Sequence, residues 1–226
     1  MTKKLILLLS AFTLTASAAD WANWRGPNHN GSTEAAGLPV KFSKTENIAW
    51  KVTMPGPSAA TPIILGDKVF VSSTDPKAKE LLALCLDRRT GKEIWRQVVG
   101  EGYQLDNRSN YASPSPVTDG EVVTFFYGNG DLATFDLNGK KLWAKKIQAE
   151  ENGFAFQWTF SSSPLLHDGI LYLQILQRNT GVRGHGKANG NESYLLALNP
   201  KTGKQLWKHN RPSNAKAESL EAFSTP

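Results

Sequence analysis

The chain has 226 residues, enough for one domain, and carries 26 Lys and Arg against 20 Asp and Glu. The formal charge of +6 is mild and the basic residues do not cluster, which argues against nucleic-acid binding. The single cysteine, Cys85, excludes an internal disulfide. Because no neighbouring base is evident in the sequence, we expect this thiol to be buried and inert.

Residues 1–18 have the layout of a secretory signal peptide. Lys3 and Lys4 precede an apolar run that begins at Leu5, and the small residues Ala16-Ser17-Ala18 follow it. The apolar run is too short to span a bilayer. We therefore expect a periplasmic or secreted bacterial protein with a mature charge of about +4 and no transmembrane segment.

Residues 19–46 form a separate N-terminal segment that begins with the run from Asp20 to Pro27 and continues as a loop rich in Gly, Asn and Ser. Exposed tryptophans so close to a terminus are costly, so we expect Trp21 and Trp24 to fix the segment onto the domain. Stacking against a ligand is the alternative. Residues 47–52 then predict a strand that carries Trp50 and would complete the last blade of a closed ring.

The rest of the chain, residues 47–226, repeats a unit that begins with a Ser-Pro or Thr-Pro pair. A short apolar strand follows each proline, and a tight turn made of Gly and Asp leads into a second apolar strand. Such turns between apolar residues are strong signals of β-hairpins. The turns are Gly66-Asp67, Asp119-Gly120 and Asp168-Gly169.

Each unit ends with a second recurring motif, in which a tryptophan follows a turn glycine by four residues. The Asp or Asn before the glycine can cap the turn with its side chain. The glycine can adopt positive φ, and the tryptophan suits packing between neighbouring sheets. We therefore predict a structural docking role for these residues, which are Asp87, Thr90, Gly91 and Trp95, then Asp136, Gly139 and Trp143, then Asn199, Thr202, Gly203 and Trp207, with Trp50 as an additional tryptophan.

These repeats predict an all-β fold, a partial β-propeller of four-stranded antiparallel blades. The blades are expected at about residues 57–100, 110–148 and 157–211, and the next blade begins near residue 218. Because three blades cannot close a ring of normal size, we expect a truncated chain. A small complete protein that assembles with copies of itself is the alternative.

The third unit is the longest, and its extra residues lie between 179 and 191. This insertion contains Arg183, His185 and Lys187, so an anion-binding loop is one interpretation. It lacks the Gly-Lys-Ser/Thr ending of a phosphate loop, which favours a flexible insertion at the blade tip. Before it, aromatic residues alternate with others over residues 154–160, which predicts a strand against an apolar layer, with a ligand groove as the alternative.

The motifs from Cys85 to Trp95 and from Ala197 to Trp207 resemble the tryptophan-docking repeat of pyrroloquinoline-quinone-like (PQQ-like) β-propellers. This superfamily includes quinoprotein alcohol dehydrogenases and the propeller component of the outer-membrane protein assembly machinery. The opening from Asp20 to Pro27 resembles secreted bacterial members of the group. The resemblance covers nearly the whole mature chain and implies the fold, but it does not imply an activity.

Resemblance to quinoprotein dehydrogenases would imply adjacent cysteines, a Ca²⁺ ion and a carboxylate base. This chain has one cysteine, and most of its carboxylates fall in turns. We therefore expect no catalytic, cofactor-binding or metal-binding residues here. The expected function is that of an exported, non-catalytic scaffold for a protein or carbohydrate partner. The alternative is a PQQ-dependent oxidoreductase in which downstream blades of the full-length protein would hold PQQ and Ca²⁺.

Overall fold

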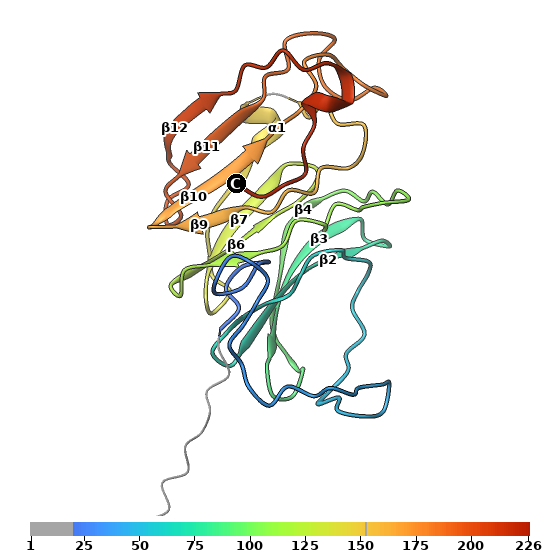
Figure 1. Ribbon diagram of the computed structural model, residues 1–226, viewed down its shortest axis with the longest axis vertical. Coiled ribbons are helices and arrows are strands. Elements are labelled where there is room, and N and C mark those ends of the chain that lie inside the picture. Colours follow the sequence, from blue (N-terminus) through green and yellow to red (C-terminus); the bar gives the residue numbers. More distant parts are fainter. Residues whose placement is uncertain (1–19, 152) are drawn as a thin grey trace, which may run out of the picture.

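The computed structural model describes residues 20–151 and 153–226, whose strands form three four-stranded antiparallel sheets (Figure 1). The predicted signal peptide, residues 1–18, lies outside the described residues. The first sheet consists of β1 (Ile63–Leu65), β2 (Lys68–Asp75), β3 (Glu80–Asp87) and β4 (Glu93–Glu101). The second consists of β5 (Val117–Thr118), β6 (Val122–Phe126), β7 (Asp131–Asp136) and β8 (Lys141–Lys146). The third consists of β9 (Leu165–His167), β10 (Ile170–Ile175), β11 (Tyr194–Leu198) and β12 (Gln205–Asn210).

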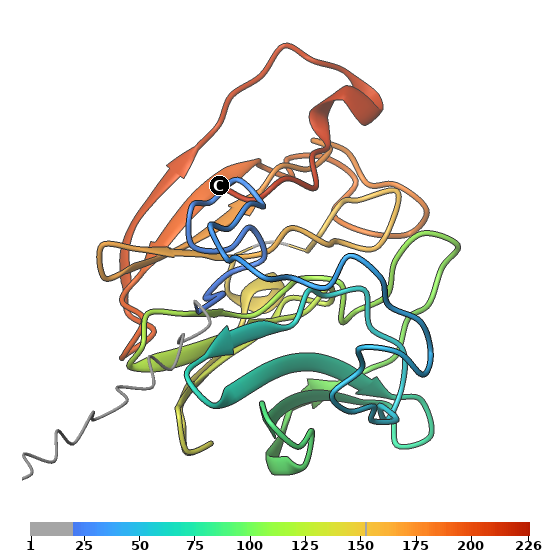
Figure 2. The same ribbon diagram turned by 60° about the horizontal axis from the view of Figure 1, so that its bottom comes forward.

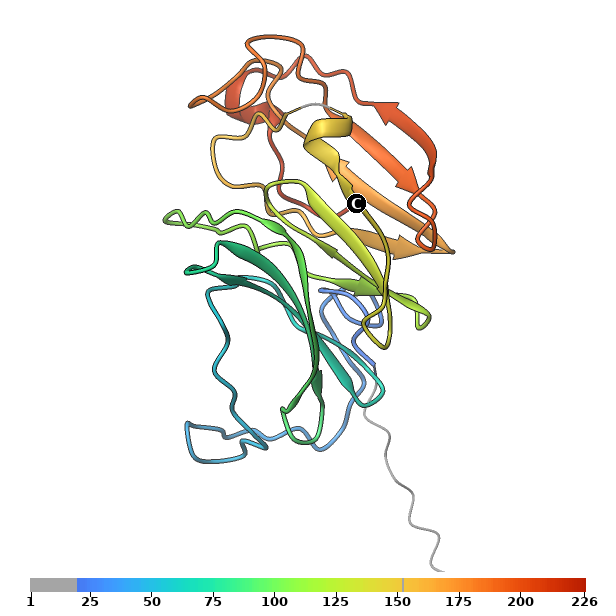
Figure 3. The same cartoon turned by 180° about the vertical axis from the view of Figure 1, so that it is seen from behind.

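Within each sheet the strands follow one another in chain order, as in a propeller blade. Helical structure in the described chain is confined to α1 (Ile147–Glu150), the yellow coil seen from behind in Figure 3, and a 3₁₀ turn over Ala217–Leu220. The predicted all-β propeller class with four-stranded antiparallel blades is confirmed. The predicted limits of the blades and of the N-terminal segment stay predictions. No helix within residues 20–151 and 153–226 is long and apolar enough to cross a membrane.

The hairpin turns set the register of the strands. Leu65 pairs with Lys68 across Gly66-Asp67, and His167 pairs with Ile170 across Asp168-Gly169, so both are two-residue turns. The turn between β5 and β6 is longer, because Thr118 pairs with Val123. There Asp119 Oδ1 accepts hydrogen bonds from the backbone N–H groups of the two residues that follow Gly120. The Asp side chain thus supplies the hydrogen bonds that a shorter turn would make through its backbone.

The three sheets lie one after another, with the second between the other two (Figure 1). Successive side chains of a strand point to opposite faces, and β6 shows the consequence. Phe125 joins a buried cluster with Phe70 and Trp95 of the first sheet, whereas Phe126 joins a cluster with Leu173 of the third sheet. The middle sheet is therefore buried on both faces, which explains why all five residues of β6 are buried and four of them are apolar.

Hydroxyl groups connect the innermost strands near their starts. The Thr61 N–H donates to Ser115 Oγ at 2.9 Å, and the Ser115 N–H donates to Ser163 Oγ at 3.0 Å. Each of these residues comes directly before the proline that begins a unit. The repeated Ser-Pro and Thr-Pro pairs therefore join one blade to the next close to the propeller axis.

The N-terminal segment runs across the first two of these strands. Trp21 and Ile64 exchange backbone hydrogen bonds of 2.8 and 2.9 Å, and the Thr118 N–H donates to the Ala22 carbonyl at 3.0 Å. Figure 2 shows this segment, in blue, beside the C-terminal end of the chain. Trp24 is thereby placed next to Thr225, and both residues line one hollow.

Two predicted strands are absent from the part of the chain that the structure describes. Residues 47–52 pair with no strand there. The segment is held instead by the side chain of Trp50, whose indole N–H donates to the Arg88 carbonyl of the first sheet. Residues 154–160 form an irregular loop. Phe154, Phe156 and Phe160 are buried in the core between the second and third sheets. Their alternation reflects this packing, which a loop achieves without strand pairing.

Candidate functional site

Three of the predicted docking tryptophans lie against a turn of the sheet that follows them in the chain. The Trp50 indole N–H donates to the Arg88 carbonyl at 2.7 Å, where the segment before the first sheet meets that sheet. The Trp95 indole donates to the Leu137 carbonyl at 3.2 Å, joining the first sheet to the second. The Trp143 indole donates to the Pro200 carbonyl at 2.7 Å, joining the second sheet to the third.

The turn glycines allow this close approach. A Cβ atom added to any of the three would lie 2.5–2.8 Å from the nearest indole atom, and each glycine has positive φ. The docked pairs are Gly91 with Trp50, Gly139 with Trp95, and Gly203 with Trp143. The fourth predicted docking tryptophan, Trp207, is 40% exposed. It packs against Tyr172 of its own sheet, with the two ring centroids 5.9 Å apart.

The polar residues of the motif are occupied within their own turns. Asp87 Oδ1 accepts hydrogen bonds from the Thr90 hydroxyl and two backbone N–H groups, and these bonds, that from Thr90 first, hold the pKa of Asp87 below its usual value. Asp136 Oδ1 accepts from two backbone N–H groups. Asn199 Oδ1 accepts from the N–H groups of Lys201 and Thr202. The motif residues therefore form separate contacts between blades and do not come together as one site.

The opposite end of the blades carries the longer loops, and we call it the loop face. A cavity of about 180 Å³ opens there between the loops that follow β4 and β8 and the 179–191 insertion. Its lining includes Gln104, Tyr111, Gln157, Trp158, Arg183 and His185. We refer to it below as the loop-face cavity. It is the candidate functional site because, beside three phenylalanines of the core, it collects polar and aromatic side chains from the loops between strands.

Asp106 holds one wall of this cavity. Its Oδ2 accepts hydrogen bonds from the Thr159 N–H at 3.1 Å and the Thr159 hydroxyl at 2.8 Å. Its Oδ1 accepts from the N–H groups of Arg108 and Ser109, both at 2.7 Å. Partial burial raises the pKa of Asp106, but the hydrogen bonds from Arg108, Thr159 and Ser109 outweigh it and lower the pKa to about 2. This carboxylate is therefore an anion that links two loops.

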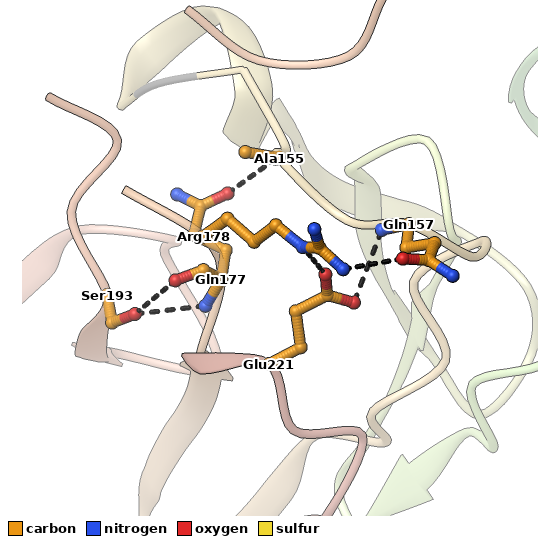
Figure 4. Close-up of polar contacts among 6 residues, drawn as sticks. All are labelled: Ala155, Gln157, Gln177, Arg178, Ser193 and Glu221. Carbon is orange, nitrogen blue, oxygen red and sulfur yellow. Dashed lines mark hydrogen bonds and ion pairs between the residues drawn. The ribbon is translucent and has the colours of Figure 1, made fainter. Parts of the chain in front are cut away.

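Glu221 holds the same 154–160 loop from the other side (Figure 4). One carboxylate oxygen accepts from the Gln157 N–H at 3.2 Å, and the other pairs with the Arg178 guanidinium, which also donates to the Gln157 side-chain oxygen. The Glu221 side chain is only 1% exposed. Further hydrogen bonds support the loop. The Ala155 N–H donates to the side-chain oxygen of Gln177, and the Ser193 hydroxyl accepts from the Gln177 N–H and donates to the Gln177 carbonyl. The loop is thus fixed at Gln157 and Thr159 by two carboxylates and at Ala155 by the Gln177 amide.

Trp158 projects from this fixed loop and contacts two arginines. The Arg108 guanidinium carbon lies 5.2 Å from the centre of the indole ring, and that of Arg183 lies 4.9 Å from it. Both arginines are exposed, and Trp158 is partly buried. The composition of the 179–191 insertion pointed to Arg183, and the aromatic alternation placed Trp158 in a strand, but no sequence pattern indicated Arg108. The one sequence signal that could have pointed to this site was the unequal length of the connections between repeats.

The remaining reactive groups lie elsewhere. Cys85 is fully buried in the first sheet, and this burial raises the pKa of its thiol to about 12. Within residues 20–151 and 153–226, no three His, Cys, Asp or Glu side chains are grouped closely enough to hold a metal ion.

Residues 33–183 match the protein family described as outer membrane protein assembly factor BamB, a family of PQQ-like repeats. The chain belongs to this family. The resemblance to PQQ-like β-propellers is thereby confirmed.

Similarity to individual proteins is lower. Over 178 residues the chain is 24% identical to the tetrathionate hydrolase of Acidithiobacillus ferrooxidans. The matched region covers 72% of this chain and 31% of the hydrolase. The chain therefore spans less than a third of that relative's length.

Among solved structures, the chain is similar to a europium-containing methanol dehydrogenase, with a TM-score of 0.58 at 17% identity over 85% of this chain and 32% of that one. It is also similar to BamB from Moraxella catarrhalis, with a TM-score of 0.42 at 20% identity over 73% of this chain and 55% of that one. The likeness to the methanol dehydrogenase shows the shared fold.

Proposed function

We propose that this protein is an exported, non-catalytic β-propeller that binds a protein or carbohydrate partner at its loop face. The observation that carries the proposal is the fixed 154–160 loop, held by Asp106 on one side and Glu221 on the other. A surface that is already rigid before binding loses little conformational entropy on binding. It borders a cavity whose lining includes polar side chains.

The chemistry of the reactive side chains also supports binding over catalysis. A general base must have a lone pair available within reach of a substrate proton. The Asp106 oxygens accept several hydrogen bonds each, and Glu221 is buried in an ion pair with Arg178. Asp87 and Asp136 cap turns at the other end of the blades. These carboxylates are therefore used to hold the structure.

The residues near the propeller axis do not fit a calcium–quinone centre. The hollow there is lined mainly by hydroxyl groups, by Trp24 and by Arg108, and its lining in the described residues includes no carboxylate. Ca²⁺ takes six to eight oxygen ligands and favours carboxylates among them. We derive no catalytic step through PQQ and propose that this part of the protein needs no cofactor. Export to the periplasm or beyond is proposed from the sequence of residues 1–18.

A titration of the protein with PQQ and CaCl₂, followed by absorbance and by dye-linked oxidation of short alcohols, tests this proposal. We expect no saturable spectral change and no dye reduction. Saturable binding of the quinone with alcohol-dependent dye reduction would favour the alternative, a quinone-dependent oxidoreductase. Fractionation of expressing cells, with N-terminal sequencing of the product, tests export. A product that keeps Met1 in the cytoplasm would contradict that part of the proposal.

A further inference from the structure

Two cations stack on one aromatic ring at the edge of the loop-face cavity, where Arg183 lines that cavity and Arg108 lines the neighbouring hollow near the propeller axis. Arg108 comes from the loop after β4 and Arg183 from the 179–191 insertion, and both guanidinium groups lie about 5 Å from the centre of the Trp158 ring. A guanidinium over an aromatic ring keeps the N–H groups at its edge available for a carboxylate or sulfate. Neither arginine has an ion-pair partner among the residues that the structure describes.

The carboxylate nearest in sequence forms no ion pair with these cations within the described residues. Asp106 is the acidic residue in the lining of the cavity, within the described chain. Its oxygens accept hydrogen bonds from the Thr159 and Ser109 side chains and from backbone N–H groups, including that of Arg108. The two arginines carry two positive charges against the single negative charge of Asp106, so the edge of the cavity keeps a net positive charge.

The rest of the lining suits hydroxyl groups and a ring. The Gln104 side-chain amide, the Gln157 Nε2 group and the Tyr111 hydroxyl make no hydrogen bond within the described residues. The Tyr111 ring is partly exposed and can lie against a flat apolar face. The volume of about 180 Å³ is below the roughly 300–1,000 Å³ of pockets for drug-sized ligands, so the cavity admits one ring at a time.

We propose that the loop-face cavity binds an acidic saccharide. Arg183 in the cavity and Arg108 in the neighbouring hollow each receive a carboxylate or sulfate group, while Gln104, Gln157 and Tyr111 contact one sugar ring and its hydroxyls. An acidic peptide would satisfy the arginines and could hydrogen-bond the amide groups through its backbone, but Asp and Glu residues offer no flat apolar ring face to Tyr111. The inference rests on the proposed function as a binding protein and names the class of its ligand.

Isothermal titration calorimetry at low ionic strength tests the inference with three tetrasaccharides. Tetragalacturonate carries carboxylates, a carrageenan tetrasaccharide carries sulfates, and cellotetraose is neutral. We expect saturable binding of at least one acidic probe and none of the neutral one. The acidic probe that binds identifies which oxyanion the arginines receive. Failure of both acidic probes, or equal binding of cellotetraose, would overturn the inference.

Substitutions separate the site from general surface charge. Arg108→Ala and Arg183→Ala should each weaken binding about tenfold or more, because each removes a charge-assisted hydrogen-bonding group. Arg183→Lys keeps the charge but loses the planar fork, so its loss should be intermediate. The matched control is Lys140→Ala, which removes one exposed charge from a turn at the opposite end of the blades. An equal loss in Lys140→Ala would refute the site.

Two further measurements complete the test. Hexaglutamate should bind more weakly than the acidic tetrasaccharides, and equal or tighter binding would assign the site to peptides and overturn the saccharide. Circular dichroism and urea melts should show that the arginine variants fold like the parent. The quinone titration tests the proposed function independently. If the protein bound neither quinone nor sugar, the saccharide inference would be refuted, whereas the proposed non-catalytic function would not.

Discussion

Replacing Trp95 by alanine tests the docking of one blade on the next. Trp95 is 9% exposed, and its ring packs against Phe70, Phe125 and Phe135 with centroids 5.9–6.3 Å away. Its indole also donates to the Leu137 carbonyl. Removing a buried aromatic ring costs about 3 kcal/mol or more, and the lost hydrogen bond about 1 kcal/mol. The free energy of unfolding should therefore fall by about 4 kcal/mol.

Trp207 provides a matched control, because it occupies the same motif position in a different environment. Its ring is 40% exposed and touches Tyr172 of its own sheet. Trp207→Ala should lower the free energy of unfolding by about 1 kcal/mol. The loss of unfolding free energy in Trp143→Ala should lie between these two values. The Trp143 ring is only partly buried, and its indole donates a hydrogen bond of 2.7 Å that the substitution removes.

Urea denaturation, followed by far-ultraviolet circular dichroism, measures all three variants against the parent. The expected order of destabilisation is Trp95, then Trp143, then Trp207. If Trp207→Ala were as damaging as Trp95→Ala, the motif would act within its own blade and the docking argument would be refuted. A Trp95→Ala protein with the stability of the parent would refute it as well.

Three other predictions concern turns, pH and the thiol. Gly139→Ala should destabilise more than Gly169→Ala in urea melts, because both have positive φ but only at Gly139 would the new Cβ meet an indole ring, at 2.8 Å; equal losses would leave only the backbone strain. Asp106 has a pKa lowered to about 2 in the folded state, so its contribution to stability is present above the unfolded value of 3.8 and is lost as pH falls toward 2. Asp106→Asn should flatten acid denaturation in that window, and an unchanged profile would contradict the assignment. Cys85 should react with a thiol reagent at pH 8 much more slowly in the folded protein than in urea, because burial removes access and raises its pKa to about 12; fast labelling of the folded protein would show that the first sheet opens readily.

The architecture could be predicted because each repeat contains its own local signals. The Gly-Asp turns fix hairpin register, and the mainly apolar sequences of β3 and β6 indicate strands buried on both faces. The prediction for residues 47–52 was wrong because a strand also needs a partner, and a single segment does not reveal whether one is available. The alternation over 154–160 indicated burial correctly and strand pairing incorrectly, since a loop can also direct three phenylalanines into a core.

The candidate site was much less accessible to sequence reasoning. Its main contacts join residues far apart in the chain, such as Arg108 with Trp158 and Asp106 with Thr159. They arise in the connections between repeats, where lengths and residue types differ from one unit to the next. The basic residues of the insertion were visible, but the tryptophan that orients Arg183 comes from another loop. No local period encodes a meeting of that kind.

The inner hydroxyl links and the outer tryptophan contacts act at two different distances from the propeller axis. Thr61, Ser115 and Ser163 join successive blades close to that axis, while Trp95 and Trp143 join them farther out. Two attachments at different radii determine the angle between neighbouring blades, whereas one alone would act as a hinge. Loops can then lengthen, shorten or change composition at the tips without altering that angle, so the loop face can diversify while the blades beneath it keep their geometry.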